Sequence, residues 1–303
     1  MEVIFLGSGG VMPTRKRKTV SIAVRREGEI LLFDCGEGCQ NGFTWGGLGV
    51  NRELKVFISH LHGDHVLGLP GLLMSLDLLG RNKELTLIGP KGIMKFVNEN
   101  LYMTYHEVGY GIKVLELEGE RITVLEGRDY RVIAVKVKHT VPCYAYVLEE
   151  ADRPGRFLPE RAIKLGVPKG PLWKELQRGI CVKLSNGRII KPFQVTEGKR
   201  RGVKIIYSGD TRPYSKLMWA ALGADLLIHE ATFSSRHYLK AMENGHTTAL
   251  EAGEIASFAD AKKLILVHIS PRYEGKEGEL LSEAKLSFEG EVMVAEDWLR
   301  IKV

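Results

Sequence analysis

Short apolar runs separated by polar turns recur along most of the chain. Runs of about four to eight residues that are rich in valine and isoleucine and end at turn residues predict β-strands. They occupy residues 3–6, 30–33, 55–58, 85–88, 122–125, 132–137 and 144–148, and then 203–207, 225–228, 263–267 and 292–295.

Apolar positions with helical spacing fall between several of these runs. They predict helices over residues 66–79, 93–101, 215–222, 247–258 and 279–286. Early strands in hairpin-like succession, followed by alternating strands and helices, indicate two mixed sheets that pack face to face with helices outside. We therefore predict an α/β fold.

This rhythm is interrupted between about residues 151 and 200. Five prolines break the stretch, and its helix-like and strand-like pieces are short. A compact domain seldom carries so long a connection without a use for it. We expect a single domain over residues 1–303 with an inserted arm at 151–200 that projects from the body. A disordered linker is the alternative, but the stretch is too apolar for a solvated tether.

Positive charge is concentrated in the same part of the chain. The 303 residues carry a net charge of +6, yet residues 151–204 contain 14 Lys or Arg against 4 Asp or Glu, so the remainder is net negative. Clusters of Lys and Arg supply much of a protein's affinity for a polyanion. The arm therefore favours a nucleic-acid partner over a generic solvated surface.

The remaining composition limits the class of protein. With 44% hydrophobic residues the chain can bury a large core, and its four cysteines lack the spacing of a paired motif. The N-terminal segment has an acidic residue where a signal peptide has basic ones, and no apolar run reaches the length of a membrane span. We predict a cytoplasmic protein without membrane association.

The most informative motif is His60-Leu61-His62-Gly63-Asp64-His65, which follows the apolar run at 55–58. A strand-to-helix turn can bring its four potential ligands together. Imidazole and carboxylate groups bind borderline divalent cations such as Zn²⁺, and a set without thiolates is typical of a site that keeps one position open for water. The motif predicts a reactive metal site.

Further potential ligands stand where predicted strands end. His139 follows the run at 132–137, Asp210 follows 203–207, His229 and Glu230 follow 225–228, and His268 follows 263–267. Open α/β folds place their sites at the carboxyl ends of strands. Each residue alone is more simply interpreted as a hydrogen-bonded histidine or a capping carboxylate, but together with the hexapeptide they favour one metal centre.

These residues resemble the signature of the metallo-β-lactamase superfamily, which is the hexapeptide followed by three later ligands. Other segments resemble the ribonuclease Z family of tRNA 3′-processing endonucleases: Phe33-Asp34-Cys35-Gly36-Glu37-Gly38, Ser208-Gly209-Asp210-Thr211-Arg212, His229-Glu230-Ala231-Thr232-Phe233 and Gly245-His246-Thr247-Thr248. The resemblance covers essentially the whole chain. It implies a metallo-β-lactamase-like αββα sandwich of two mixed sheets flanked by helices, with a protruding arm.

The resemblance also implies a site for two Zn²⁺ per subunit. It assigns one ion to three histidines, the other to an aspartate and two histidines, and a second aspartate as the bridge: His60, His62 and His139; Asp64, His65 and His268; and Asp210. Two such cations about 3.5–4 Å apart lower the pKa of a water shared between them. Asp64 is the residue that we expect to accept the proton of this water.

A proton donor for the leaving oxygen is sought outside the ligand set. His246, in the Gly-His-Thr-Thr turn, is the candidate, and a carboxylate such as Glu230 would orient it. The alternative is that His246 only caps the helix that begins near residue 247. We expect His229 to be structural or to support the metal ligands indirectly.

Two basic segments are the candidate substrate contacts. The stretch at 166–173 resembles the Gly-Pro motif of the family's arm, which in that family grips the tRNA elbow, usually across a dimer, and this implies contacts from Lys169, Gly170 and Pro171 and a homodimer. The second segment matches a family loop near the 3′ end of the acceptor stem: Arg15, Lys16, Arg17 and Lys18. Lys18 stands where the family commonly has asparagine.

These features together predict a zinc-dependent endoribonuclease that removes the 3′ trailer from precursor tRNA and leaves a 3′-hydroxyl on the tRNA and a 5′-phosphate on the trailer. Two alternatives remain. A small-ester, lactone or thioester hydrolase could share the hexapeptide, although it does not require a basic arm. An RNA-binding protein with a vestigial metal site is the other, and the intact set of seven ligands argues against it.

Overall fold

The computed structural model describes all residues from 1 to 303, and the chain divides into two compact units. The larger unit, here called the body, comprises Met1–Gly127, Arg131–Leu148 and Lys204–Val303. The smaller unit, here called the inserted unit, comprises Arg128–Tyr130 and Glu149–Val203.

One seven-stranded sheet is built mainly from the first third of the chain. Its strand order is β16-β1-β2-β3-β4-β5-β6, antiparallel from β16 to β3 and parallel from β3 to β6. The bounds are β1 Glu2–Gly7, β2 Ser21–Arg26, β3 Glu29–Phe33, β4 Glu53–Phe57, β5 Leu85–Pro90, β6 Ile112–Leu117 and β16 Arg300–Lys302.

The second seven-stranded sheet has the order β15-β14-β13-β12-β9-β8-β7, and its strands β12 to β15 are parallel. Strands β7 and β8 pair antiparallel, so this sheet is also mixed. The bounds are β7 Arg121–Glu126, β8 Tyr130–Val137, β9 Cys143–Glu150, β12 Lys204–Tyr207, β13 Leu226–Glu230, β14 Lys263–Val267 and β15 Glu291–Val294.

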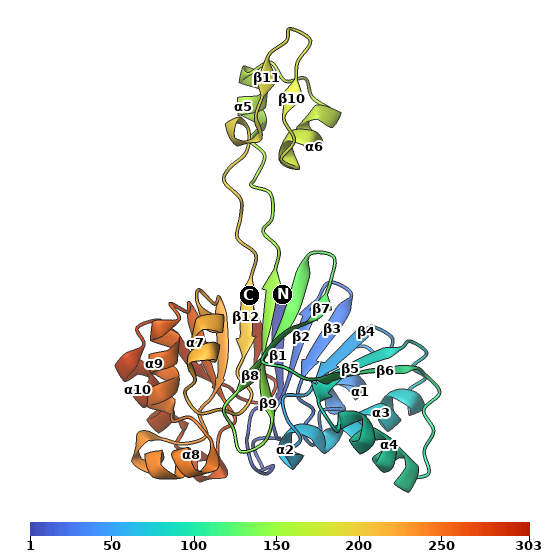
Figure 1. Ribbon diagram of the computed structural model, residues 1–303, viewed down its shortest axis with the longest axis vertical. Helices are drawn as coiled ribbons and strands as arrows, with labels where there is room; N and C mark the ends of the chain where they lie inside the picture. Colours follow the sequence, from blue (N-terminus) through green and yellow to red (C-terminus); the bar gives the residue numbers. More distant parts are fainter. The chain divides into compact units, whose positions relative to one another are not determined.

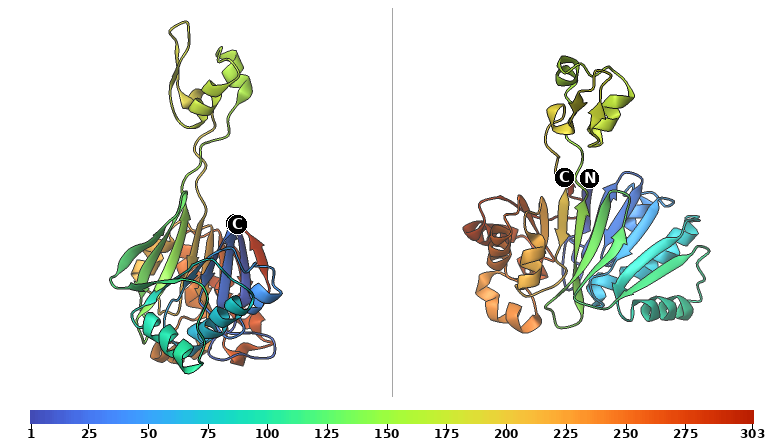
Figure 2. Two further views of the ribbon diagram at one scale, coloured as in Figure 1. Left: turned by 90° about the vertical axis from the view of Figure 1, so that its right-hand side faces the viewer. Right: turned by 45° about the horizontal axis from the view of Figure 1, so that its top comes forward.

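Helices of the body cover the outer faces of the two sheets, and Figures 1 and 2 show this layered arrangement. On the side of the first sheet lie α1 Asn41–Thr44, α2 Gly63–Val66, α3 Gly68–Leu78 and α4 Ile93–Met103. On the side of the second lie α7 Ser215–Ala221, α8 Tyr238–Asn244, α9 Ala249–Phe258 and α10 Glu277–Ser287. The predicted α/β sandwich is confirmed. Of the observed α-helices of the body, only α8 and the four-residue α1 and α2 were not predicted from the sequence pattern.

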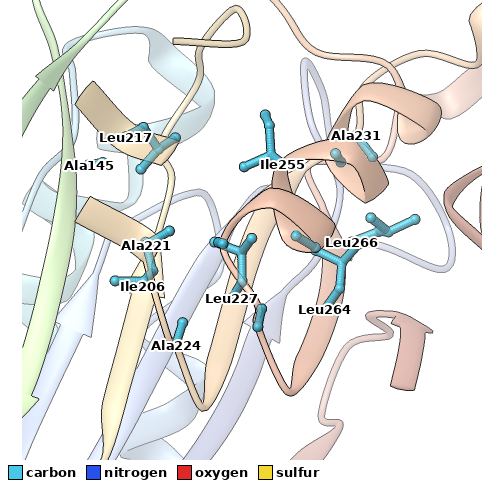
Figure 3. Packing of buried hydrophobic residues seen from close by; sticks show 14 of the residues in the cluster. Ala145, Ile206, Leu217, Ala221, Ala224, Leu227, Ala231, Ile255, Leu264 and Leu266 are labelled. Atoms are coloured by element: carbon cyan, nitrogen blue, oxygen red, sulfur yellow. The ribbon is translucent and has the colours of Figure 1, made fainter. Parts of the chain in front are cut away.

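Three apolar layers hold the body together. Figure 3 shows the layer between the second sheet and its helices, where Leu217 and Ile255 pack against Leu227 and Leu266. A similar cluster joins the first sheet to α3 and α4. Between the sheets, the rings of Phe33 and Tyr207 lie with centroids 6.0 Å apart. Since β3 and β12 belong to different sheets, this contact fixes one sheet against the other close to the strand ends that carry the predicted ligands.

The inserted unit has a small core of its own. It contains α5 Pro159–Lys164, α6 Pro171–Gln177, the two-stranded sheet β10 Val182–Lys183 and β11 Ile189–Ile190, and a short 3-10 helix Pro192–Gln194. Its buried side chains are Ala162, Val167, Leu176, Val182, Leu184, Ile190 and Val195. The segment predicted as an arm, 151–200, lies within this unit, and a disordered linker would lack such a core.

No helix of either unit combines the length and the apolar character that crossing a membrane would require.

Candidate metal centre

The predicted ligands meet at the carboxyl ends of strands from both sheets. The hexapeptide connects β4 to α2, His139 follows β8, Asp210 follows β12 and His268 follows β14. Chain reversal at the end of each buried strand leaves these polar side chains at one common edge. The structure therefore brings together all seven residues that the sequence singled out as ligands.

Three histidine nitrogens converge at one point of this edge. Nε2 of His60 lies 3.0 Å from Nδ1 of His62, and Nε2 of His139 lies 3.2 Å from the same atom. The other ring nitrogen of His60 lies 3.0 Å from Oγ of Ser59, and Nδ1 of His139 donates to the carbonyl of Gly245 at 2.9 Å. Partners on the far ring nitrogen fix the orientation of a ligating histidine and leave its other nitrogen free for a cation.

A second group contains Asp64, His65 and His268. Nε2 of His268 lies 3.0 Å from Oδ2 of Asp64, and Nε2 of His65 lies 3.8 Å from it. His65 donates from Nδ1 to Asp34 at 2.7 Å, while its buried Nε2 has no hydrogen-bond partner. A buried, unpartnered ring nitrogen that faces carboxylates fits a site for a cation.

Asp210 lies between the two groups. Its Oδ2 is close to one nitrogen in each of four proposed ligand histidines, 3.3 Å from His65, 3.4 Å from His268, 3.7 Å from His60 and 4.0 Å from His139, and it also lies 3.7 Å from Nδ1 of His246. Its other oxygen is buried without a hydrogen-bond partner. A central carboxylate with both groups of ligands around it is the arrangement expected of a bridge between two cations.

The electrostatics favour the ligating forms of Asp210 and His60. Burial opposes ionisation of Asp210, but the neighbouring His268 and His65 hold the pKa of its carboxyl well below the usual range. Burial, followed by the proximity of His65, lowers the pKa of the His60 imidazole well below its usual value. An ionised carboxylate and a neutral imidazole are the forms that bind metal.

Asp34 supports the site, although the sequence analysis assigned it no role. Its buried carboxylate accepts hydrogen bonds from the backbone N–H of Ser59 at 2.6 Å, the Ser59 hydroxyl at 2.7 Å, the Tyr207 hydroxyl at 2.5 Å and Nδ1 of His65. Asp34 adopts a φ of 55°, an uncommon conformation for a residue other than glycine. The available signal was its position directly after the end of β3.

Gly245 is a second residue that supports the proposed ligands and that the sequence pattern did not indicate. It ends α8 with a φ of 74°, and a Cβ at this position would lie 2.9 Å from Nδ1 of His139. A side chain here would therefore combine backbone strain with displacement of a ligand. Because position 245 is glycine, its carbonyl can accept the hydrogen bond from Nδ1 of His139.

The half-buried His246 and the buried Glu230 form a pair beside the proposed ligands. Nδ1 of His246 lies 3.0 Å from Oε1 of Glu230, which also accepts the backbone N–H of Thr211 at 2.8 Å, and the other carboxylate oxygen accepts the Thr232 hydroxyl at 2.6 Å. Burial alone would lower the pKa of His246, but the charge and hydrogen bond of Glu230 raise it to about 9. Its imidazole is therefore held in the protonated form at neutral pH.

His246 does not cap the following helix. The N-cap of α9 is Thr248, whose hydroxyl accepts the N–H of Glu251 while the Glu251 side chain accepts the N–H of Thr248. Arg212 binds the carbonyl of His246 and also pairs with Glu251 at 2.6 Å. The capping alternative is wrong, and the turn that carries His246 is fixed on both sides.

An open cleft of about 650 Å³ gives access to this centre. Its walls include five of the proposed ligands, His62, Asp64, His139, Asp210 and His268, together with His246. His229 lies elsewhere: it is buried, and its Nδ1 contacts the carbonyl of Glu230 at 2.8 Å. The cleft thus presents a polar ligand cluster and one protonated histidine to solvent.

The basic segment near the N-terminus needs one correction. Arg15 and Lys16 are exposed and Lys18 is half-buried, but Arg17 is only 5% exposed. The guanidinium of Arg17 donates to the Ser8 hydroxyl at 2.7 Å and pairs with Glu277 at 3.3 Å. Arg17 is therefore a structural residue in this fold, and the predicted surface contact to substrate is wrong for it.

The turn at 169–171 of the inserted unit is exposed. Lys169 and Gly170 precede α6, which begins at Pro171, and Gly170 has a φ of 143°. Two flanking side chains hold the turn, since Val167 is buried and the indole N–H of Trp173 donates to the Val167 carbonyl at 3.3 Å. The residues predicted to contact tRNA are thus presented to solvent by a fixed frame.

Comparisons with known proteins agree with this geometry. The family model of the β-lactamase superfamily domain matches residues 193–269, and that of the anti-Pycsar protein Apyc1 matches residues 1–145. The chain is 44% identical over 303 residues to Ribonuclease Z of Methanothermobacter thermautotrophicus, covering 100% of this chain and 97% of the relative. It is 40% identical to Ribonuclease Z of Methanosarcina mazei, covering 100% and 98%.

Solved structures show the same likeness. The short form of human tRNase Z matches with a TM-score of 0.72 and 27% identity over 100% of this chain and 99% of that one. The metallo-β-lactamase fold protein YhfI of Bacillus subtilis matches with a TM-score of 0.69 and 20% identity over 99% of both chains, which shows the fold alone. Together with the clusters of His and Asp, these matches support metal binding at the site.

Proposed function

The chain belongs to the ribonuclease Z family, and we infer from this membership and from the site that it is a metal-dependent endoribonuclease that removes the 3′ trailer from precursor tRNA. The observation that carries the inference is a buried ligand cluster with the protonated His246 at its edge. Such an arrangement can activate water on one side of a phosphodiester and protonate the leaving oxygen on the other.

We propose that the cluster holds two Zn²⁺. Three imidazoles, those of His60, His62 and His139, suit one ion, and the mixed group of Asp64, His65 and His268 suits the other, because zinc binds both donor types. Asp210 would bridge them. When bound, such a pair lowers the pKa of water and stabilises the charge that develops on a phosphoryl group.

Asp64 is the proposed proton acceptor for the attacking water. Its Oδ2 already accepts the backbone N–H of Val11 at 2.6 Å and faces Nε2 of His268, so its carboxylate is held in one orientation. Burial opposes ionisation of Asp64, but the hydrogen bond of His268 and the charge of His65 lower its pKa, and the carboxylate is ionised at neutral pH.

His246 is the proposed donor to the leaving 3′ oxygen of the tRNA. Glu230 occupies Nδ1, so Nε2 is the nitrogen left to deliver the proton. Transfer of this proton leaves a 3′-hydroxyl on the tRNA, and the phosphate stays on the 5′ end of the trailer. Glu230 acts on His246 rather than on the substrate, and we assign it a positioning role.

The inserted unit is the proposed contact for the body of the tRNA. Its Lys and Arg side chains between residues 151 and 200 are all exposed, which suits recognition of an RNA backbone by charge and shape. By analogy with the family we propose that Lys169, Gly170 and Pro171 contact the tRNA, that Arg15, Lys16 and Lys18 contact it near the acceptor end, and that the protein is a cytoplasmic homodimer.

The decisive experiment uses a precursor tRNA transcript with a 3′ trailer. We expect the wild type to release the trailer with a 3′-hydroxyl on the tRNA, and Asp64→Ala to bind the transcript but cleave it about a hundredfold more slowly, roughly 3 kcal/mol of barrier. A lactone and a thioester serve as competing substrates, and chelation followed by Zn²⁺ addition tests reversibility.

Two outcomes would contradict the proposal. Faster turnover of the lactone or thioester than of the transcript would favour the small-molecule hydrolase. Tight RNA binding with no metal-dependent cleavage by the wild type would favour an RNA-binding protein with a vestigial site. A cleavage rate for Asp64→Ala equal to that of the wild type would remove its role as proton acceptor.

A further inference from the structure

Arg272 is the only Lys or Arg side chain among the residues that line the cleft. It lies in the short 3-10 helix Pro271–Tyr273, four positions after the ligand His268. The residue is exposed, and its guanidinium makes no ion pair and no hydrogen bond with the protein. By contrast Arg212, also near the site, is paired with Glu251.

The guanidinium of Arg272 is held by an aromatic ring instead. It lies over the face of Phe233, 5.6 Å from the ring centroid. A cation on an aromatic face is weakly stabilised and keeps all its N–H groups available. The arrangement leaves the planar fork of Arg272 oriented and open toward the cleft, which suits two oxygens of one phosphate.

Phe233 also locates Arg272 relative to the reaction. Its ring centroid is 5.9 Å from that of His246, and the His246 ring is 5.3 Å from the His268 ring. One wall of the cleft therefore runs from the ligands through His246 and Phe233 to Arg272. Arg272 therefore lies on the same wall as the proposed proton donor His246, and the ring of Phe233 separates the two side chains.

We propose that Arg272 binds the phosphate on the tRNA side of the scissile bond, the one that joins the last two retained nucleotides. This inference rests on the proposed function, in which His246 protonates the 3′ oxygen of the last retained nucleotide. Since only the ring of Phe233 separates Arg272 from His246, Arg272 then faces the sugar and the 5′ phosphate of that same nucleotide. The role is binding and positioning of the substrate, and the scissile phosphate is left to the ligand cluster.

The charges of the cleft explain why this position needs a cation. Glu37, Asp64 and Asp210 contribute carboxylates to its lining, and these repel every phosphate except one held directly by bound cations. An RNA strand that enters the cleft therefore needs a cation there to balance the negative charge of the phosphates next to the scissile one. Apart from His246, which is paired with Glu230, Arg272 is the one cationic side chain in the cleft lining that can balance this charge.

The test combines a protein change with a change in a single phosphate. Arg272→Gln and Arg272→Lys are compared with Lys276→Gln, an exposed neighbour outside the cleft lining. The substrate is a precursor tRNA that carries one uncharged methylphosphonate, either at the proposed phosphate or at the second phosphate of the trailer. A small phosphodiester without neighbouring phosphates, bis(p-nitrophenyl) phosphate, is the third substrate.

We expect Arg272→Gln to lower kcat/KM for the natural transcript about tenfold or more, in the range that loss of one charge-assisted contact gives. The loss for the small diester should be at least several times smaller. Arg272→Lys should recover part of the activity, since it keeps the charge but loses the fork. The methylphosphonate at the proposed phosphate should slow the wild type to a similar degree but add little to the defect of Arg272→Gln.

Other results would overturn the inference. An equal loss on RNA and on the small diester would place Arg272 at the scissile phosphate or in the structure of the site. Additive effects of Arg272→Gln and the methylphosphonate, or a matching defect in Lys276→Gln, would mean that the two groups do not meet. Failure of the wild type to cleave the unmodified transcript would instead refute the proposed function, so the two failures are distinguishable.

Discussion

The ligand cluster and the inserted unit differ in how they keep their charges. In the cluster, charged and polar groups are buried or half-buried, and the far sides of the histidines are fixed by Asp34, Ser59, Gly245 and Thr232. In the inserted unit the cations stand on the surface of a small frame, with a core of only seven buried side chains. The ligand cluster thus keeps its charged groups inside the fold, whereas the inserted unit exposes its charged groups to solvent.

Because of this difference, changes in the two regions should affect different measured quantities. Interactions in a buried, preorganised site depend strongly on geometry and weakly on salt, whereas exposed charges are screened within about 10 Å at 0.1 M ionic strength. Changes in the cluster should therefore appear in metal content and kcat. Changes in the inserted unit should appear in KM and in the salt dependence.

The largest effect is expected from Asp210→Ala. Its Oδ2 lies within 4.0 Å of nitrogens of four proposed ligand histidines and of His246, so its removal leaves both groups of proposed ligands without their common carboxylate. We expect bound metal to fall below the wild-type stoichiometry and kcat to fall by roughly a thousandfold, about 4 kcal/mol of barrier. Elemental analysis beside single-turnover cleavage measures both.

Asp297→Asn is a suitable control for Asp210→Ala. Asp297 is also largely buried, but it accepts hydrogen bonds from Ser8 and Lys18 rather than facing the cluster. If this variant lost as much metal as Asp210→Ala, the position of Asp210 between the two groups would not be the cause of the loss.

A smaller effect is expected from His246→Ala, which removes the proton donor but no proposed ligand. Cleavage should slow by roughly a hundredfold, with metal content unchanged. His237→Ala is the matched control, since that histidine contacts the Tyr273 hydroxyl at 2.8 Å and lies outside the cleft lining. Loss of metal in His246→Ala would show that this residue belongs to the ligand set instead.

The pH dependence sharpens the same assignment. Because the pKa of His246 is raised to about 9, its acid form persists through neutral pH and the rate should fall only as pH rises through that value. Glu230→Gln removes the charge that raises this pKa, so the alkaline limb should move to lower pH. The measurement is a pH–rate profile of kcat for both proteins. If the alkaline limb of Glu230→Gln stayed at the wild-type pH, the limb would not report the ionisation of His246.

The residues of the proposed metal centre could be located from the sequence because each signal was local. His139, Asp210 and His268 stand within three positions of the end of an apolar run, and parallel strands bring their carboxyl ends to one edge. The support given by Asp34 could not be predicted in this way. It depends on the Tyr207 hydroxyl, which comes from the other sheet and stands 173 positions later in the chain, and spacing within one segment carries no information about packing between sheets.

Two of the three strands of the body that the pattern missed, β6 and β16, and the error at Arg17 have physical causes as well; the third, β2, was missed although its residues Ile22, Ala23 and Val24 are apolar and buried. β6 lies at the edge of its sheet and alternates half-buried with exposed residues, and β16 has three residues that pair only with β1. Neither gives a continuous apolar run. Arg17 stands among exposed basic neighbours, and in a loop no periodicity indicates which side chain turns inward. Its burial follows from acceptors that lie far away in the sequence, such as Glu277.

The smallest effect, and the clearest test of the contrast between the regions, is expected from neutralising exposed cations of the inserted unit. The triple change Lys169→Gln, Lys174→Gln and Arg178→Gln removes three surface charges at and after the exposed turn and no buried side chain. We expect KM for precursor tRNA to rise about tenfold near physiological salt, and the slope of log KM against log salt to fall by roughly two to three, since each lost phosphate contact contributes a little under one. kcat and metal content should stay close to the wild type.

Lys91→Gln with Lys95→Gln provides the matched control for this triple change. Both lysines are exposed on the body, where Lys91 pairs with Glu118 at 3.4 Å and Lys95 with Glu99 at 3.6 Å. If the inserted unit supplies phosphate contacts, the control should leave the salt slope unchanged although it also lowers the net charge. An equal change in both variants would mean that total charge, and not the inserted unit, determines the affinity for RNA. A fall in kcat with unchanged KM in the triple variant would instead assign these cations to the chemical step and remove the distinction between the two regions.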